Sequence, residues 1–115
     1  MIRQVAVIHT AFEDVPRTVA LVQVPDYMDD VQALEFAFEK TNNIMGSWSL
    51  GPDVAIDGEM IKNPDYCERV TVMSALPVSK RTGAVMGLRS TSMGDQMLLG
   101  TKKYQVAMIG FKEIV

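Results

Sequence analysis

The chain has 115 residues, of which 48% are hydrophobic and 22% charged, a composition typical of a folded globular protein rather than a disordered one. Its net charge of −3 argues against general nucleic-acid binding, its single cysteine excludes an internal disulfide, and no apolar run is long enough to cross a membrane. The first residues show no signal-peptide pattern, so we expect a single domain over residues 1–115 that resides in the cytoplasm without membrane attachment.

The first predicted elements are two strands followed by a helix. Ile2–Thr10 and Thr18–Val24 are rich in β-branched residues, and the short turn between them predicts an antiparallel hairpin. Asp30–Asn42 then shows apolar side chains at helical spacing, with Asp29 or Asp30 as the N-cap. This is the one long helix that the sequence predicts.

The second part of the chain predicts short strands separated by loops. We expect Ile44–Tyr66 to be a long irregular region, because it contains three glycines and two prolines, and Cys67–Leu76 to be a strand. Gln96–Leu99 and Tyr104–Ile109 flank a turn and predict a second hairpin, and Phe111–Val115 is expected at the edge of the sheet. The predicted fold class is α+β, a mostly antiparallel β-sheet with one main amphipathic helix packed on it.

The charges are divided unevenly between the two parts of the chain. Residues 1–66 contain 11 acidic and 4 basic side chains, whereas residues 67–115 contain 3 acidic and 7 basic ones. This asymmetry predicts either an acidic face and a separate face suited to an anion, or no patch if the two parts intermix in the folded chain.

The sequence does not favour an enzyme. His9 and Cys67 are the only histidine and the only cysteine, so the usual four-ligand zinc site would need carboxylates in addition. Neither the P-loop nor the glycine-rich dinucleotide-binding motif is present. A Cys67–His9 pair could provide a nucleophile and its base, but a lone cysteine is more often a small buried apolar residue. We expect no catalytic residue, no metal and no cofactor.

The stretch from Arg89 to Asp95 is the strongest candidate for a ligand site. Backbone amides, hydroxyls and an arginine in a glycine-containing turn are the groups that bind a phosphate. The predicted ligand-binding residues around it are Arg89, Ser90, Thr91, Ser92 and Lys102. The alternative is a β-turn in which Asp95 ties down its own loop.

Trp48, the only tryptophan, lies in a loop between Gly46 and Gly51. One interpretation makes it a ligand-binding residue that stacks on a base, or an anchor for a protein partner. The other makes it a loop side chain that folds down to fill the core beside the helix.

Two motifs occur together in this chain, TNNIMGSWS at residues 41–49 and RSTSMGD at residues 89–95, the second followed by Tyr104, Gly110 and Phe111. The combination resembles small, mostly uncharacterised accessory proteins of bacteriophages and related mobile elements. The likeness extends over most of the chain. It implies a setting in the cytoplasm of a host cell, and no catalytic residue can be carried over from it.

The resemblance and the candidate residues together predict a non-enzymatic, phage-type binding protein that counters host defence. In its most concrete form the protein sequesters a phosphorylated, cyclic nucleotide signal as a homo-oligomer, with Trp48 stacked on the base and Arg89 at the phosphate. The alternative is a protein–protein inhibitor that uses its acidic surface against a host defence or CRISPR-type complex. A third hypothesis is a small enzyme that uses His9.

Overall fold

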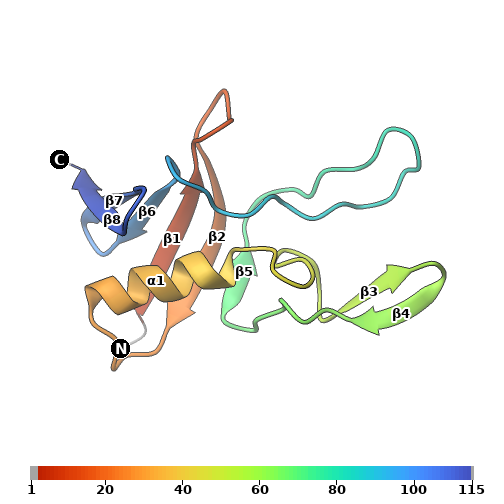
Figure 1. The fold of residues 1–115 in the computed structure, drawn as a ribbon, viewed down its shortest axis with the longest axis horizontal. Helices are drawn as coiled ribbons and strands as arrows, with labels where there is room; N and C mark the ends of the chain where they lie inside the picture. Colours follow the sequence, from red (N-terminus) through yellow and green to blue (C-terminus); the bar gives the residue numbers. More distant parts are fainter. Residues whose placement is uncertain (1–2, 115) are drawn as a thin grey trace.

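The computed structural model describes residues 3–114, and its main feature is a six-stranded antiparallel sheet (Figure 1). The strands of this sheet are β1 (Arg3–His9), β2 (Arg17–Val24), β5 (Val70–Val72), β6 (Gln96–Leu99), β7 (Lys102–Val106) and β8 (Phe111–Ile114). Their spatial order is β5-β2-β1-β6-β7-β8, so β1 and β2 form a central hairpin and β8 lies at one edge.

One helix, α1 (Asp30–Lys40), packs across one face of this sheet (Figure 1). Asp29 is its N-cap: the Asp29 carboxylate accepts the amide of Gln32 over 2.8 Å, and the Gln32 side chain accepts the amide of Asp29 over 3.0 Å. This capping box satisfies two backbone donors that the first turn leaves unpaired. The apolar side of α1 is buried against the sheet through Ala33, Leu34 and Ala37.

The hydrophobic core lies between α1 and the sheet. Alternation along β1 turns Val5, Val7 and His9 inward, as expected for a strand with one buried face. The largest apolar side chains of the core are Trp48, Leu34, Met97, Val5, Val7, Val19 and Val22.

Two arms project from one end of the core (Figure 1). The hairpin arm consists of β3 (Asp53–Ile56) and β4 (Glu59–Lys62), which form a two-stranded sheet of their own. The loop arm consists of residues 77–87, and an isolated antiparallel bridge joins Val78 to Val85 within it. The arms extend along the longest dimension of the molecule, which measures 45 Å against 33 and 23 Å for the other two.

The predicted α+β fold class is confirmed, and so are most of the elements. The predicted first hairpin corresponds to β1 and β2, and the predicted helix corresponds to α1, which ends at Lys40 rather than Asn42. The second predicted hairpin corresponds to β6 and β7, although β7 begins at Lys102 and ends at Val106. The last strand lies at the sheet edge as expected, while Ile2 and Val115 lie outside the described residues.

Two predictions about the middle of the chain were correct only in part. The region Ile44–Tyr66 is not irregular throughout, because it contains the hairpin arm. Asp57 and Gly58 both adopt positive φ angles, 51° and 81°, which is the two-residue turn that an Asp-Gly pair favours between strands. The predicted strand Cys67–Leu76 is reduced to the three residues of β5, because the chain turns just before it, where the amide of Val70 donates to the carbonyl of Cys67.

Within residues 3–114, no helix combines the length and the apolar character that a membrane crossing requires.

Candidate functional site

Asp95 lies at the centre of the predicted ligand site and has no exposed surface. Its carboxylate forms a two-point ion pair with Arg89, in which Nη1 lies 2.7 Å from Oδ2 and Nη2 lies 2.9 Å from Oδ1. Planar, bidentate pairs of this kind are among the strongest polar contacts in proteins. The arginine predicted to hold a phosphate is therefore paired with an acid of its own segment.

Three backbone amides complete the environment of Asp95. Ser92 donates to Oδ2 over 2.8 Å, while Thr10 and Ala11 donate to Oδ1 over 2.8 and 2.9 Å. The first of these bonds closes a turn within the segment, which confirms the alternative prediction that Asp95 ties down its own loop. The other two bind the loop between β1 and β2 to the same carboxylate.

These contacts keep Asp95 ionised. Burial alone would raise the pKa of Asp95, but the hydrogen bonds from Arg89 and from the three amides outweigh burial and hold its pKa below the ordinary value. The segment is therefore organised around a buried negative charge that is neutralised from within the chain.

Arg89 has no N–H group left over in this arrangement. Besides its two bonds to Asp95, Nη1 donates to the carbonyl of Ser90 over 3.0 Å, Nη2 donates to the carbonyl of Ala11, and Nε lies 3.3 Å from the Glu13 carboxylate. A guanidinium has five N–H groups, and all five are engaged. Phosphate binding by Arg89 stays a prediction, and it would require one of these bonds to be exchanged.

Trp48 reaches the same segment from the other motif. Its indole Nε1–H donates to the carbonyl of Arg89 over 2.9 Å, and the residue is only 2% exposed. The ring of His9 meets the indole edge-on, with 6.3 Å between the ring centroids. The two motifs thus lie together as the sequence predicted, but Trp48 fills the core, which is the second of the two interpretations. In this position its indole presents no free face to a base.

The hydroxyl residues of the segment are also engaged inside the protein. Ser90 Oγ accepts the amide of Asn43 over 2.8 Å, and the buried hydroxyl of Thr91 donates to Thr41 over 2.8 Å. Ser92 contributes its amide to the turn described above. These contacts join the 89–95 segment to the C-terminal end of α1.

Lys102 lies apart from the other predicted ligand-binding residues. It is paired with Leu99 at the far end of the β6–β7 hairpin, where it lines an open cavity of about 390 Å³. Arg3 and Asp30 line the same cavity and form an ion pair with each other. The structure therefore does not bring Lys102 to Arg89.

A buried chain of hydroxyl groups connects His9 to α1. His9 Nε2 lies 3.0 Å from Thr91 Oγ1, which donates to Thr41 Oγ1, which donates in turn to the carbonyl of Ala37 over 2.8 Å. Thr91 uses its single hydroxyl proton in the bond to Thr41, so its oxygen can only accept a hydrogen bond from His9. The Nε2 atom of His9 therefore carries a proton. Burial lowers the pKa of His9, and the charge of Asp95, 3.9 Å away, only partly opposes this. His9 is therefore neutral and structural at neutral pH.

The loop around the first motif holds the base of the hairpin arm. We call residues 41–51 the socket. Asn63, the first residue after β4, is buried, and its side-chain nitrogen donates to the carbonyls of Ser47 over 2.6 Å and Gly51 over 2.9 Å. Its Oδ1 accepts the amide of Ser47 over 3.0 Å. One asparagine thereby fixes the position at which the chain returns from the hairpin arm.

The socket also holds the base of the loop arm. The amide of Leu88, directly after that arm, donates to Ser49 Oγ over 2.7 Å, and the carbonyl of Leu88 accepts Asn43 Nδ2 over 3.0 Å. Among residues 3–114, every buried side-chain nitrogen or oxygen has a hydrogen-bond partner. Both arms therefore start from a fully satisfied polar network.

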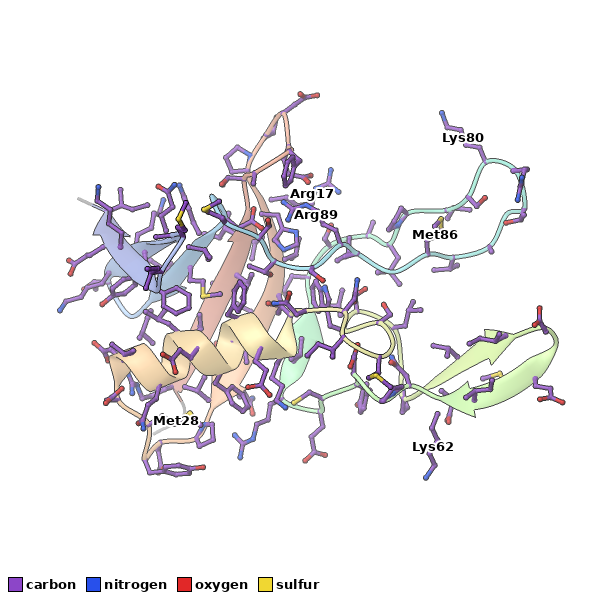
Figure 2. The ribbon with its side chains drawn as sticks, viewed as in Figure 1. Arg17, Met28, Lys62, Lys80, Met86 and Arg89 are labelled. Atoms are coloured by element: carbon purple, nitrogen blue, oxygen red, sulfur yellow. The ribbon has the colours of Figure 1, made fainter. Side chains whose placement is uncertain are left out.

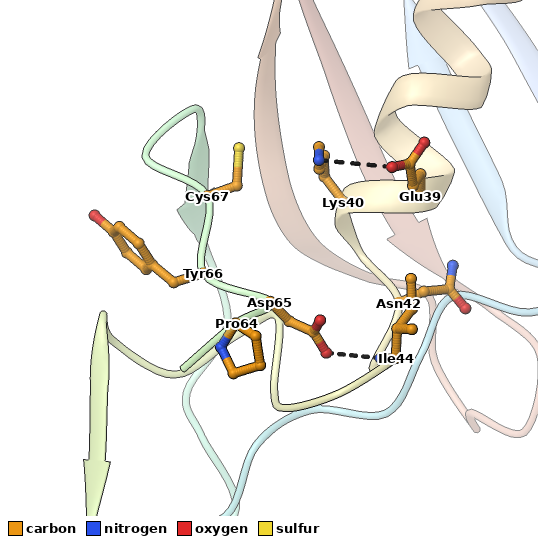
Figure 3. A pocket seen from close by; sticks show the side chains of 8 residues that line it. All are labelled: Glu39, Lys40, Asn42, Ile44, Pro64, Asp65, Tyr66 and Cys67. Carbon is orange, nitrogen blue, oxygen red and sulfur yellow. Dashed lines mark hydrogen bonds and ion pairs between the residues drawn. The ribbon is translucent and has the colours of Figure 1, made fainter. Parts of the chain in front are cut away.

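A small cavity of about 190 Å³ lies beside the socket, where α1 ends (Figure 3). Its lining residues are Glu39, Lys40, Asn42, Ile44, Pro64, Asp65, Tyr66 and Cys67. Asp65 accepts the amides of Ile44, Met45 and Gly46, so its carboxylate holds the socket instead of facing a ligand. Residues 3–114 contain no group of three side chains arranged to hold a metal ion.

The hairpin arm presents apolar side chains to solvent. The register places Val54 opposite Ile61, and Ile56 shares their face of the two-stranded sheet. Ile56 is 50% exposed and Ile61 43% exposed, and Met60 on the other face is 69% exposed. This surface was not predicted from the sequence, although the Asp-Gly turn could have revealed the hairpin.

The loop arm presents a second apolar surface. Val78 and Val85 lie opposite each other in the isolated bridge and are 57% and 58% exposed. Met86 beside them is 52% exposed, and Figure 2 shows it on the arm together with Lys80. Both arms therefore expose apolar side chains in groups, although single apolar side chains elsewhere, such as Phe12 and Ile109, are exposed further.

Comparison with protein-family models found no match, and comparisons with curated proteins and with solved structures likewise found no significant similarity.

Asp95→Asn should destabilise the fold strongly, because it removes the bidentate counter-ion of the Arg89 guanidinium, which keeps only Glu13 at 3.3 Å, and turns one acceptor oxygen into a donor. We expect a loss of roughly 2–4 kcal/mol in the free energy of unfolding, measured by urea denaturation. Asp53→Asn, at an exposed acid, is the matched control and should change stability by less than about 0.5 kcal/mol. Equal effects of the two variants would contradict the central role of Asp95.

Stability should fall as the pH drops below 6.5, the ordinary pKa of histidine, because the unfolded chain then binds a proton at His9 more readily than the folded chain does. The contribution of neutral His9 to the free energy of unfolding is fully present above pH 6.5, and it is lost as the pH falls through the lowered pKa of His9 in the folded state. Urea denaturation at several pH values between neutral and weakly acidic would measure the slope. His9→Gln removes the titrating group and should flatten it; an unchanged slope would contradict the assignment.

Gly46→Ala should disturb the socket, because a Cβ at this position would overlap with Asn63 Oδ1, which is held by the amides of Ser47 and Asp65. We expect a loss of about 1–3 kcal/mol in the free energy of unfolding. Gly51→Ala is the matched control, since a Cβ there meets no atom within 4 Å. A control that loses as much stability as Gly46→Ala would show that the overlap is not the cause.

Proposed function

We propose that this protein is a non-enzymatic protein-binding module whose contact surface is formed by the hairpin arm and the loop arm. The observation that carries the proposal is the exposure of apolar side chains on both arms, with Ile56 and Met60 on one and Val78 and Val85 on the other. Grouped, exposed apolar side chains typically mark interaction sites.

The physics of small hairpins supports this assignment. A two-stranded hairpin in water is marginally stable unless a third strand, a helix or another surface covers it. No residue of β4 is buried, and in β3 only Val54 is partly covered. The open edges of such a hairpin offer unpaired backbone groups as well as apolar side chains. Contact with another protein would supply the missing cover.

The bases of the arms also support the proposal that the arms bind another protein. Asn63 and Leu88 anchor the arms to the socket through hydrogen bonds that are buried or partly buried. An arm with a fixed base loses less conformational freedom on binding than a loop that must first become ordered. The chain thus combines exposed contact groups with a rigid mounting.

The contacts of the predicted ligand site favour a protein over a nucleotide as the partner. All N–H groups of Arg89 are engaged, and the indole of Trp48 is buried. Sequestration of a cyclic nucleotide would require both residues to leave their present partners. In the phage setting that the resemblance implies, the proposed module acts on host defence by occupying a protein.

Ile56→Ser combined with Ile61→Ser should abolish partner binding without unfolding the protein. Burial of an isoleucine contributes about 1.5–3 kcal/mol, so two such losses should weaken binding by about 100-fold or more. The test is affinity capture by the tagged chain in a bacterial lysate that also contains an untagged copy of the chain, with each captured protein quantified. The melting temperature of the variant should stay within a few degrees of wild type.

Met108→Ser combined with Ile109→Ser is the matched control, because these side chains are 84% and 91% exposed and lie outside the arms. Capture should persist in this control. Capture that survives in the arm variant, or that fails equally in both, would contradict the proposal. A nucleotide that raises the melting temperature of the wild type would instead support the sequestration hypothesis.

A further inference from the structure

The two arms carry opposite charges. The hairpin arm contains three acids, Asp53, Asp57 and Glu59, against the single base Lys62. The loop arm contains two bases and no acid: Lys80 and Arg81. All six side chains are exposed. Apolar residues of both arms, Ile56 and Ile61 on one and Val78 and Val85 on the other, are exposed as well, so the arms do not cover each other within one chain.

We infer that the arms of the free protein bind a second copy of this chain, with the hairpin arm of each copy against the loop arm of the other. The inference rests on the proposed function, in which the arms are the contact surface. A second copy of the chain is the partner that fits the charges and the apolar faces of the arms. Opposite charges on facing surfaces favour this pairing, whereas like charges would oppose it.

The arrangement of the arms allows both contacts to form at once. In Figure 1 the two arms extend in the same direction, with the loop arm above the hairpin arm. Consider a two-fold axis that is perpendicular to the plane of Figure 1 and passes near the tips of the arms. It places a second copy on the opposite side, and in that copy the hairpin arm lies above the loop arm. Each loop arm then meets a hairpin arm, and the same contact occurs twice, as two-fold symmetry requires.

Another two-fold axis would give the wrong partners. A vertical axis in the plane of Figure 1 would set loop arm against loop arm and hairpin arm against hairpin arm. Lys80 and Arg81 would then face the same two bases of the other copy. The charges therefore select the first arrangement.

The number of residues in the two arms lies at the lower end of what one side of a standard interface contains. The hairpin arm has 10 residues and the loop arm has 11, so each copy could contribute at most 21 residues from its arms to a contact in which one side has roughly 20–30. Apolar side chains such as Ile56 and Val85 would lie inside the contact, and the charged residues at the turns would surround them.

Light scattering coupled to size-exclusion chromatography, over a wide range of protein concentration, tests the inference. The wild type should reach twice the 12.7 kDa mass of the chain. Lys80→Glu with Arg81→Glu makes the loop arm acidic, and Asp57→Asn with Glu59→Lys makes the hairpin arm basic; asparagine tolerates the positive φ at position 57. Each variant alone should dissociate at least about tenfold more readily than the wild type.

Mixing the two variants should restore a dimer that contains one copy of each, because every facing pair of arms is again of opposite charge. Lys102→Glu with Lys103→Glu is the control for the loop-arm variant, because it changes the net charge by the same amount as Lys80→Glu with Arg81→Glu but lies outside the arms. This control should leave the dimer intact. A wild type that stays monomeric, a mixture that fails to associate, or a control that dissociates equally would overturn the inference. If the wild type is monomeric while arm-dependent capture of another protein persists, the proposed function stands and only the second copy is excluded.

Discussion

A carboxylate without contact to water must be compensated on every side, and Asp95 meets this condition with donors from two separate parts of the chain. Arg89 and the amide of Ser92 come from its own segment, while Thr10 and Ala11 come from the loop after β1. The charge therefore determines where the segment before β6 runs. That path places the carbonyl of Arg89 against the indole of Trp48, and the indole in turn positions the socket on which both arms depend.

Several polar side chains are buried beside the arms, while the arms themselves expose apolar side chains. The buried interior beside α1 holds His9, Thr41, Ser49, Asn63, Thr91 and Asp95, whereas the arms outside carry isoleucine, valine and methionine in contact with solvent. Buried polar networks are sensitive to geometry, because each missing partner leaves a desolvated group. The network thus gives the bases of the arms a defined position, and the apolar side chains provide the surface that another molecule would cover.

Local signals were sufficient for much of the fold. The β-branched residues of β1 and the N-cap at Asp29 lie within or next to the elements that they specify, and both elements were predicted. The Asp57–Gly58 turn is equally local, but the glycines and prolines around it concealed the hairpin arm. The environments of Trp48 and Arg89 could not be derived in this way. The indole finds its acceptor 41 residues away, and an arginine among hydroxyls has the same sequence pattern whether its counter-ion is a phosphate or an aspartate.

The separation between socket and arms has a consequence for how such a protein can change over time. Each arm returns to the core at the socket, where Asn63 and Leu88 hold the points of return. No residue of either arm, 53–62 or 77–87, belongs to the hydrophobic cluster between α1 and the sheet, so substitutions or length changes within the arms should leave the packing of α1 on the sheet intact. New binding preferences can therefore arise in the arms while the scaffold keeps its stability, so that recognition and folding are open to selection as two nearly independent traits.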